Sequence, residues 1–339
     1  MRRFQAVVWE WMGEMVKITE PAPAQIREEL QRLIIKLDAE IPPKLLDRNL
    51  LIATWNLRKF HRVSTEWMGD LKLGVRDYHS IRCIAEIIRR FDVVAIQEVR
   101  GDAEAFKILL EALGNNWGFA LSDINYGTLG NLERSAYLFD TRKVVLSGLI
   151  GEYVVVLDNR GTRSSLDMSS QFARAPYLAS FQVGSKRFTL INMHLVYGDR
   201  EATETRKEVR EVAKWLERLS KEEAIWNENL IVVGDVNIRS KRDPSYKAFL
   251  STGLHIPKEL DKVRCTIFDD PVAPVRKYAQ IAWFKENQEE RVFSLQYTKR
   301  AGNFDFTEIA LSTRNLTKQQ LSFSISDFLP LWVEFSLRD

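Results

Sequence analysis

Short apolar runs recur along the chain from Asn49 onward, and polar, glycine or proline residues bound each of them. Runs of this length and composition are typical of buried strands. The predicted strands are Leu50–Thr54, Val93–Ile96, Ala136–Phe139, Tyr177–Phe181, Phe188–Asn192, Leu230–Val233, Gln280–Phe284 and Leu331–Phe335. Helical patterns lie between some of these runs, at Ile81–Arg90, Ala103–Leu113 and Glu201–Leu219. Many strands with intervening helices predict an α/β fold in which two sheets pack face to face under a cover of helices.

Residues 1–48 have a different pattern. Apolar residues recur at helical spacing between Ala24 and Glu40, and prolines bound this stretch at Pro21-Ala22-Pro23 and Pro42-Pro43. We expect a leader and one amphipathic helix that docks on a main domain spanning residues 49–339. The alternative is that this helix binds a partner protein.

Composition narrows the class of protein only slightly. Of the 339 residues, 45% are apolar and 28% are charged, which is ordinary for a globular protein. The net charge of +3 does not by itself indicate a nucleic-acid binder, although a local basic groove can sit on a nearly neutral body. Two cysteines in unrelated contexts, Cys83 and Cys265, favour a reducing compartment. No apolar stretch reaches the roughly 18 residues of a membrane span, so we expect a cytoplasmic protein without a membrane segment.

Polar side chains follow several of the predicted strands. Asn56 comes directly after the first strand, where an asparagine is commonly a turn residue. Glu98 follows the buried run before it, and a carboxylate so placed is either a solvated strand end or a ligand for Mg²⁺. Arg100 lies two residues further on and is suited to contact a phosphate. Asp327, just before the last strand, is another candidate metal ligand.

Two other groups add proton chemistry. His194 follows a strand, and its imidazole titrates near neutral pH, so it is either a structural histidine or an acid or base. Glu133 is a candidate to orient it. In Gly234-Asp235-Val236-Asn237, the glycine lets the chain leave the sheet, and Asp235 and Asn237 are expected to point the same way from an extended segment. Such a pair can hold and activate a water molecule, whereas a plain turn is the alternative.

In this order, the segments resemble the motifs of the endonuclease/exonuclease/phosphatase family, whose best-known member is deoxyribonuclease I: Trp55-Asn56, Gln97-Glu98, His194, Gly234-Asp235-Val236-Asn237 and Ser326-Asp327. The resemblance covers about Asn49 to Phe335. It implies a four-layered α/β sandwich, with two mainly antiparallel sheets flanked by helices, and hydrolysis of a phosphate ester with Mg²⁺ or Mn²⁺.

The resemblance also assigns roles by position. The implied metal ligands are Asn56, Glu98 and Asp327, whereas Asp235 and Asn237 would position the attacking water and the phosphate. His194 would be a rim histidine partnered by Glu133. Two arginines match positions that touch the nucleic-acid backbone in nuclease members, Arg100 and Arg174.

The chain departs from the family pattern at two positions. The family motif ends in Ser-Asp-His, but here Phe328 follows Asp327. An upstream aspartate that orients the second histidine is also absent if Tyr278-Ala279 matches that motif, because Ala279 then stands in its place. In an alternative register Asp305 supplies this carboxylate.

These residues predict a metal-dependent phosphodiester hydrolase of the nuclease type, with DNA or RNA as its substrate and an active site impaired by Phe328 and Ala279. Loss of a positioned imidazole typically slows a reaction by about 10²–10⁴-fold. One alternative is a retired enzyme that binds nucleic acid or a protein. Another is a hydrolase of phospholipids or small phosphate esters.

Overall fold

The computed structural model describes most of the chain, and all structural statements below concern these residues. They are residues 20–71, 75–126, 130–153, 172–195, 209, 212–217, 219, 229–251, 253–269, 276–284 and 294–338.

Two six-stranded sheets form the centre of the molecule. The first has the strand order β13-β14-β1-β4-β6-β5. Its strands are β1 (Asn49–Phe60), β4 (Val93–Arg100), β5 (Trp117–Leu121), β6 (Glu133–Asp140), β13 (Gln296–Asn303) and β14 (Leu331–Ser336). Only β1 and β4 run parallel, and every other neighbouring pair in this sheet is antiparallel.

The second sheet has the order β11-β12-β10-β9-β8-β7. Its strands are β7 (Val145–Glu152), β8 (Tyr177–Val183), β9 (Lys186–His194), β10 (Leu230–Ile238), β11 (Leu254–His255) and β12 (Lys277–Phe284). As in the first sheet, one central pair is parallel, here β9 and β10, and the remaining pairs are antiparallel. A separate two-stranded sheet pairs β2 (Arg62–Val63) with β3 (Val75–Arg76).

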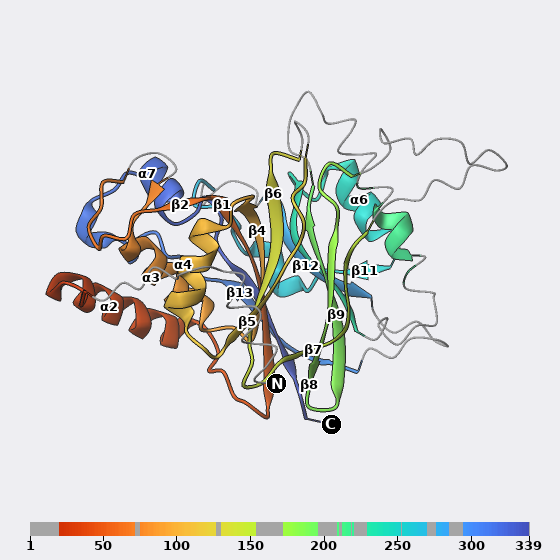
Figure 1. The fold of residues 1–339 in the computed structure, drawn as a ribbon. Helices are drawn as coiled ribbons and strands as arrows, with labels where there is room; N and C mark the ends of the chain where they lie inside the picture. The colour runs from red at the N-terminus through yellow and green to blue at the C-terminus, as the bar shows by residue number, and fades with distance from the viewer. Residues whose placement is uncertain are drawn as a thin grey trace.

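The sheets pack face to face, as the view along their edges shows (Figure 1). Their central strands are almost wholly buried, and several polar groups between the sheets are hydrogen-bonded. Gln97 of β4 donates to Asn192 Oδ1 of β9 at 2.7 Å, and Asn192 donates back to the carbonyl of Ile96 at 3.0 Å. The Tyr137 hydroxyl reaches the Tyr177 and Leu190 carbonyls at 2.7 and 2.9 Å. Satisfied polar groups of this kind fix the registration of two otherwise apolar faces.

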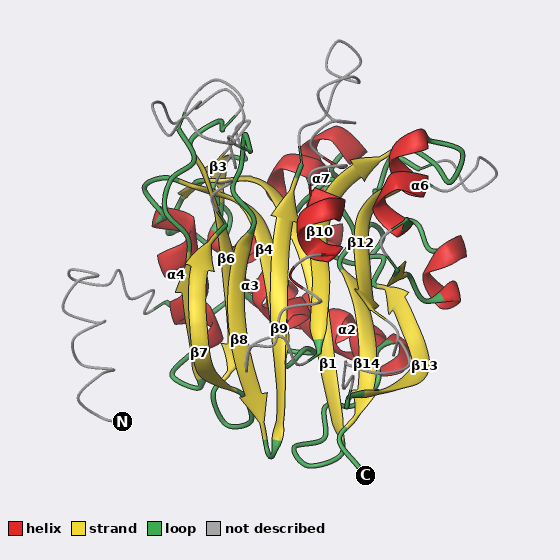
Figure 2. Ribbon diagram, turned by 90° about the vertical axis from the view of Figure 1, so that its right-hand side faces the viewer, coloured by secondary structure: helices red, strands yellow, loops and turns green. Residues whose placement is uncertain are grey.

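Helices cover the outer faces of the sandwich (Figures 1 and 2). The first sheet is covered by α2 (Ala24–Glu40), α3 (Tyr78–Ile88) and α4 (Glu104–Leu113), and α6 (Pro244–Leu250) lies on the side of the second sheet. Short elements complete the described fold: α7 (Lys318–Ser324), η3 (Lys258–Lys262) and η4 (Ser312–Arg314). The apolar face of α2 is buried against the body of the protein through Ile26, Leu33 and Leu37, each 0% exposed.

The predicted α/β sandwich is confirmed, and every predicted strand lies inside an observed one. Four layers result, with helices outside both sheets (Figure 1). The apolar pattern missed β5, β7 and β13 and the two-residue strands β2, β3 and β11. Strand β7 is partly or fully exposed along its whole length, and β13 carries Lys299 and Arg300, so neither produces an apolar run. The predicted helix over residues 201–219 lies largely outside the described residues.

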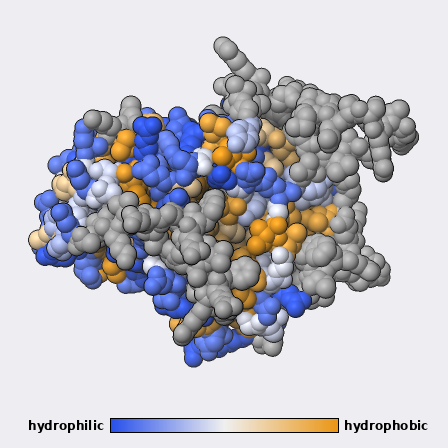
Figure 3. Space-filling view, viewed as in Figure 1, coloured by the Kyte–Doolittle hydropathy of each residue, from blue (hydrophilic) through white to orange (hydrophobic). Residues whose placement is uncertain are grey.

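The described surface mixes hydrophilic and hydrophobic residues on the face seen in Figure 3. None of the described helices is long and apolar enough to span a membrane. The division at residue 48 between a leader and a main domain stays a prediction, although α2 packs on α3.

Candidate active site

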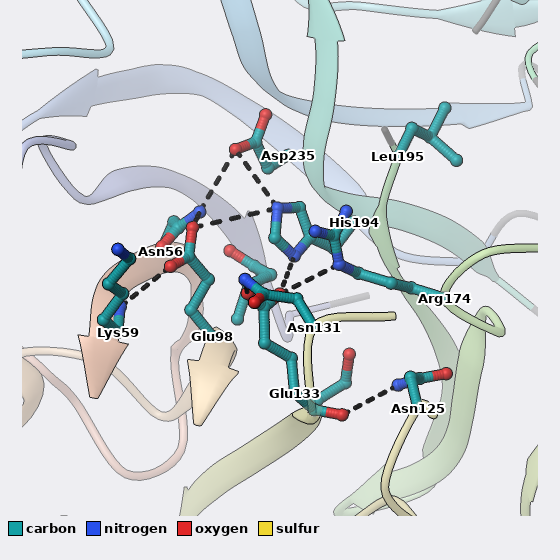
Figure 4. Close-up of polar contacts among 12 residues, drawn as sticks. Asn56, Lys59, Glu98, Asn125, Asn131, Glu133, Arg174, His194, Leu195 and Asp235 are labelled. Atoms are coloured by element: carbon teal, nitrogen blue, oxygen red, sulfur yellow. Dashed lines mark hydrogen bonds and ion pairs between the residues drawn. The ribbon is translucent and has the colours of Figure 1, made fainter. Parts of the chain in front are cut away.

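Four of the predicted residues meet where strands of both sheets end (Figure 4). The Asn56 amide, near the end of β1, donates to Glu98 Oε1 of β4 at 2.9 Å. The same Nδ2 atom donates to Asp235 Oδ2 of β10 at 3.2 Å. His194 of β9 completes the group, with Nε2 3.9 Å from both Glu98 Oε1 and Asp235 Oδ2. Segments that are far apart in the sequence therefore converge on one polar centre that bridges the two sheets.

Glu133 holds the other side of the imidazole. Its Oε2 lies 3.1 Å from His194 Nδ1, as predicted. Burial and the nearby Arg174 charge oppose protonation of His194, but the hydrogen bond and charge of Glu133, together with Asp235, raise the pKa of the imidazole above its ordinary value. The pKa of Glu133 is lowered despite its burial, because His194 and two arginines stabilise the carboxylate. The pair therefore favours a cationic imidazole that faces Glu98 and Asp235.

The two predicted arginines converge on Glu133. Arg174 Nε lies 2.9 Å from Glu133 Oε2, and Arg100 Nη1 lies 3.9 Å from Oε1. Asn131 donates to the same Oε1 at 2.5 Å, a contact that the sequence did not indicate. Both guanidinium groups are largely buried, at 13% and 17% exposure, so their first role in the structure is to fix Glu133.

Asp327 lies beside Arg58, which follows Asn56 by two residues. Arg58 Nη1 is 3.3 Å from Asp327 Oδ2, and its guanidinium stacks on the Phe323 ring at 4.0 Å from the centroid. Burial raises the pKa of Asp327 to about 6; Arg58 opposes this shift, while the charges of Glu98 and Asp235 add to it. Asp327 Oδ1 is buried and has no hydrogen-bond partner among the described residues.

The second half of β10 differs in part from its predicted geometry. Gly234 has φ +130, and a Cβ there would lie 2.0 Å from the Met193 carbonyl oxygen, so only glycine fits against β9. Asn237 has φ 51, in the left-handed region, and the ladder to β12 shifts between Asp235 and Ile238. The predicted segment lies within β10, and Asn237 is the position at which its backbone departs from the extended conformation. The Asn237 amide donates to the Leu195 carbonyl at 2.6 Å, and its backbone N–H donates to Asp235 Oδ1 at 3.2 Å.

Several solved structures are similar to this chain in fold. A humanized D. rerio TDP2 superposes with a TM-score of 0.54 and 16% identity over 85% of this chain and 98% of that chain. An endonuclease/exonuclease/phosphatase family protein from Bacteroides thetaiotaomicron gives 0.52 and 17%, over 86% and 98%. A mannosyl-6-phosphatase from the same species gives 0.52 and 16%, over 84% and 99%. The chain has the endonuclease/exonuclease/phosphatase fold. The sequence itself matches no family model and no curated protein.

Within this fold, the described acidic residues suit a hard cation. Glu98, Asp235 and Asp327 form one electrostatic group, because the charge of Glu98 raises the pKa of both aspartates. Oxygen ligands of this kind, with an amide oxygen and retained waters, are what Mg²⁺ favours. The unpartnered, buried Oδ1 of Asp327 is the observation that best fits such an ion. Arg58 holds the other oxygen and would share this carboxylate with a metal.

Phe328 is the position where the resemblance predicts a lost histidine. It is 9% exposed, bridges to Thr266 and lies near Tyr278, with ring centroids 6.4 Å apart. Ala279, which follows Tyr278 in β12, pairs with Asp235 of β10. Asp305 lies on a segment that also adjoins Phe328, since the Phe304 amide donates to the Pro330 carbonyl at 3.2 Å.

Both candidate segments, around Ala279 and Asp305, therefore adjoin the segment that carries Phe328. Ala279 adjoins the ring that faces Phe328, whereas Asp305 is held by Arg264 and by the Thr307 hydroxyl.

Arg76 is the residue beneath the site that sequence reasoning missed. It is 1% exposed, and its Nη2 donates to the Leu57 carbonyl at 2.6 Å and the Ile325 carbonyl at 3.2 Å. It therefore ties the end of β1 to the segment that carries Asp327. No local pattern marks it, because it lies in a two-residue strand and its partners are carbonyls of segments distant in the sequence.

Proposed function

We propose that the protein is a metal-dependent phosphodiester hydrolase of the nuclease type that acts on DNA or RNA with Mg²⁺ or Mn²⁺. The observation that supports this most directly is the hydrogen-bonded centre of Asn56, Glu98, Asp235 and His194, with Asp327 beside it. A carboxylate-rich centre joined to a charged imidazole is suited to attack on a phosphate ester.

Each residue has a proposed part in the reaction. Asn56, Glu98 and Asp327 would hold the cation, which when bound supplies charge stabilisation and a template for the phosphate. Asp235 would accept a hydrogen bond from the attacking water, and burial raises its pKa, which makes it a better proton acceptor than an exposed carboxylate. His194, kept charged by Glu133, would donate a hydrogen bond to a phosphate oxygen. Asn237 would position the same phosphate or the water.

Nucleic acid is the substrate class that the basic residues favour. Arg58 and Lys59 follow Asn56 closely, and Arg100 and Arg174 lie on the opposite side of the centre, around Glu133. Basic groups on both sides suit a phosphodiester backbone that passes through the site. The D. rerio TDP2 protein, which shares the fold, has also been solved with a single-stranded DNA product.

We expect the activity of this chain to be weak. Phe328 offers no proton and no hydrogen bond, so the transition state loses one contact that an imidazole would make. Such a loss corresponds to about 10²–10⁴-fold in rate. This observation also favours a second candidate, a retired enzyme that binds nucleic acid without cutting it.

A panel of substrates separates the candidates. Plasmid DNA, single-stranded DNA, single-stranded RNA, a phospholipid and small phosphate mono- and diesters would be incubated with the protein and Mg²⁺ or Mn²⁺. The proposal expects slow cleavage of a nucleic acid that chelation abolishes and that Asp235→Asn lowers by at least about 100-fold. Binding with a steep salt dependence but no cleavage, even by the Phe328→His variant, would support the retired enzyme instead. Cleavage confined to a phospholipid or to small esters would overturn the nuclease assignment.

A further inference from the structure

A second cluster of metal-binding side chains lies under α2, away from the candidate active site. It comprises Glu29 of α2 and His79 and Cys83 of α3, and each is 0% exposed. One ligand atom from each residue lies within 4.8 Å of the other two. Among the described residues, no other group of three His, Cys, Asp or Glu side chains brings its ligand atoms this close together.

The helices place the three side chains together without distortion. His79 and Cys83 are four residues apart on α3, so they share one face of that helix. Glu29 comes from the buried stripe of α2, which packs against α3. A polar face in the middle of an apolar helix contact needs an explanation, because burying such groups costs free energy unless they have partners.

Hydrogen bonds satisfy only the outer side of the cluster. Glu29 Oε2 accepts from the Thr313 amide at 2.9 Å and from the Ser312 hydroxyl at 3.1 Å. The inner oxygen, Oε1, lies 2.9 Å from His79 Nε2, yet neither atom has a hydrogen-bond partner among the described residues. The other ring nitrogen of His79, Nδ1, is likewise unpartnered there. A carboxylate held from outside, with its inner oxygen facing an imidazole nitrogen and a cysteine sulfur, is the usual environment of a metal ligand.

We propose that Glu29, His79 and Cys83 bind a zinc ion that fastens α2 to the main body of the protein. Carboxylate oxygen, imidazole nitrogen and cysteine sulfur are the ligands that Zn²⁺ takes in structural sites. A sulfur and a nitrogen ligand disfavour Mg²⁺ and Ca²⁺, which prefer oxygen alone.

Binding changes the protonation of one ligand. Burial and the charge of Glu29 raise the pKa of the Cys83 thiol, so without an ion the sulfur carries its proton. On binding, the S–H bond breaks, a Zn–S bond forms, and the proton passes to solvent. The ion then supplies the positive charge that a buried thiolate and carboxylate require.

Metal content and cobalt spectra of the full chain test the proposal. The protein would be treated with a chelator, reloaded with Zn²⁺ or Co²⁺, desalted and analysed for bound metal. We expect about one tightly held zinc per chain and, with Co²⁺, a thiolate-to-metal charge-transfer band, because cobalt occupies zinc sites with the same ligands. Cys83→Ser should abolish the band, and His79→Gln should weaken binding at least about 10-fold.

Two control variants assign the signal to this cluster. Cys265→Ser removes the other buried cysteine and should leave the band unchanged. Glu98→Gln alters the candidate active site, whose ligands contain no sulfur, and should also leave the band unchanged. The proposal is independent of hydrolase activity.

If Cys83→Ser does not fold, the zinc proposal can be tested on the wild-type protein alone. X-ray absorption at the zinc edge should show one sulfur neighbour together with nitrogen or oxygen. A folded wild-type protein that retains no zinc and shows no charge-transfer band would overturn the proposal and leave Glu29 and His79 as a bare ion pair.

Discussion

The indole Nε1 of Trp55 donates a hydrogen bond to the carbonyl oxygen of Phe328 at 2.8 Å. A second bond joins the same two segments, because the Ser326 hydroxyl donates to the Asn56 carbonyl at 2.5 Å. The first and last motif segments of the chain are thus fastened to each other through backbone carbonyls. These contacts do not depend on the side chain at position 328. A phenylalanine and a histidine at this position should therefore leave the surrounding backbone equally well held.

A histidine introduced at position 328 should raise the activity. We expect Phe328→His combined with Ala279→Asp to increase kcat/KM for the cleaved substrate by about 10²–10⁴-fold, because an oriented imidazole supplies the missing proton and hydrogen bond. The measurement is steady-state cleavage of a fluorogenic oligonucleotide with Mg²⁺.

The single variants separate the two registers. If Asp305 is the orienting carboxylate, Phe328→His alone should give most of the gain, whereas if Ala279 marks the lost position, the gain needs both changes. Ala279→Asp alone should give none, and its melting temperature must be checked since it places a carboxylate opposite Asp235. A double variant that folds and is no faster than wild type would contradict the assignment of Phe328.

The carboxylates Glu98 and Asp327 should control the metal requirement. Glu98→Gln and Asp327→Asn keep the shape of each side chain but remove the negative charge that an ion needs. We expect each to lower activity at a fixed Mg²⁺ concentration by at least about 100-fold and to raise the Mg²⁺ concentration for half-maximal rate. Metal titrations of the cleavage rate measure both. Asp47→Asn, at a carboxylate that is 84% exposed, is the matched control and should change neither.

The sheets could be predicted because their apolar runs are unambiguous. β4 and β10 are buried at nearly every position. A near-continuous apolar run of this kind is typical of a strand that is buried on both faces. The exposed strands β7 and β13 escaped detection for the opposite reason. Many of their side chains face solvent, and their place in the sheet is set by backbone pairing with β8 and β14, which no local pattern records.

The site was predictable as a set of strand ends, and less so in its detailed geometry. The order of motifs placed Asn56, Glu98, His194 and Asp235 together, and their contacts bear this out. The left-handed backbone of Asn237 was not foreseen, because the bulge between β10 and β12 depends on tertiary pairing. Likewise, the pairing of Arg58 with Asp327 requires the fold, since 269 residues separate them in the chain.

Gly234 should be irreplaceable on steric grounds. A Cβ at this position meets the Met193 carbonyl oxygen at 2.0 Å, a backbone atom that cannot move without disrupting β9. Gly148 is a matched control, since its φ of +143 is close to the +130 of Gly234 but nothing described lies within 4 Å of the place that a Cβ would take there. Strain at positive φ should cost each Ala variant about 1–3 kcal/mol. We expect Gly234→Ala to lose at least about 2 kcal/mol more than Gly148→Ala in urea unfolding, and equal losses would contradict the close approach.

Asp140 should make the stability of the protein depend on acid pH. Its side chain is 0% exposed, and it accepts bonds from Lys44 Nζ at 2.6 Å and Arg142 Nη2 at 2.5 Å. Burial alone would raise its pKa, but the bonds from Arg142 and Lys44 outweigh burial and lower the pKa below the ordinary 3.8. A folded-state pKa below the unfolded one means that the carboxylate stabilises the protein fully above pH 3.8 and loses this contribution as the pH falls further.

We therefore expect Asp140→Asn to lower the free energy of unfolding by about 3 kcal/mol at neutral pH. The difference from wild type should shrink below pH 3.8, as followed by urea unfolding across the acid range. Asp123→Asn, at a carboxylate 83% exposed, should show neither effect, and a wild-type difference that stays constant with pH would contradict the role of Asp140.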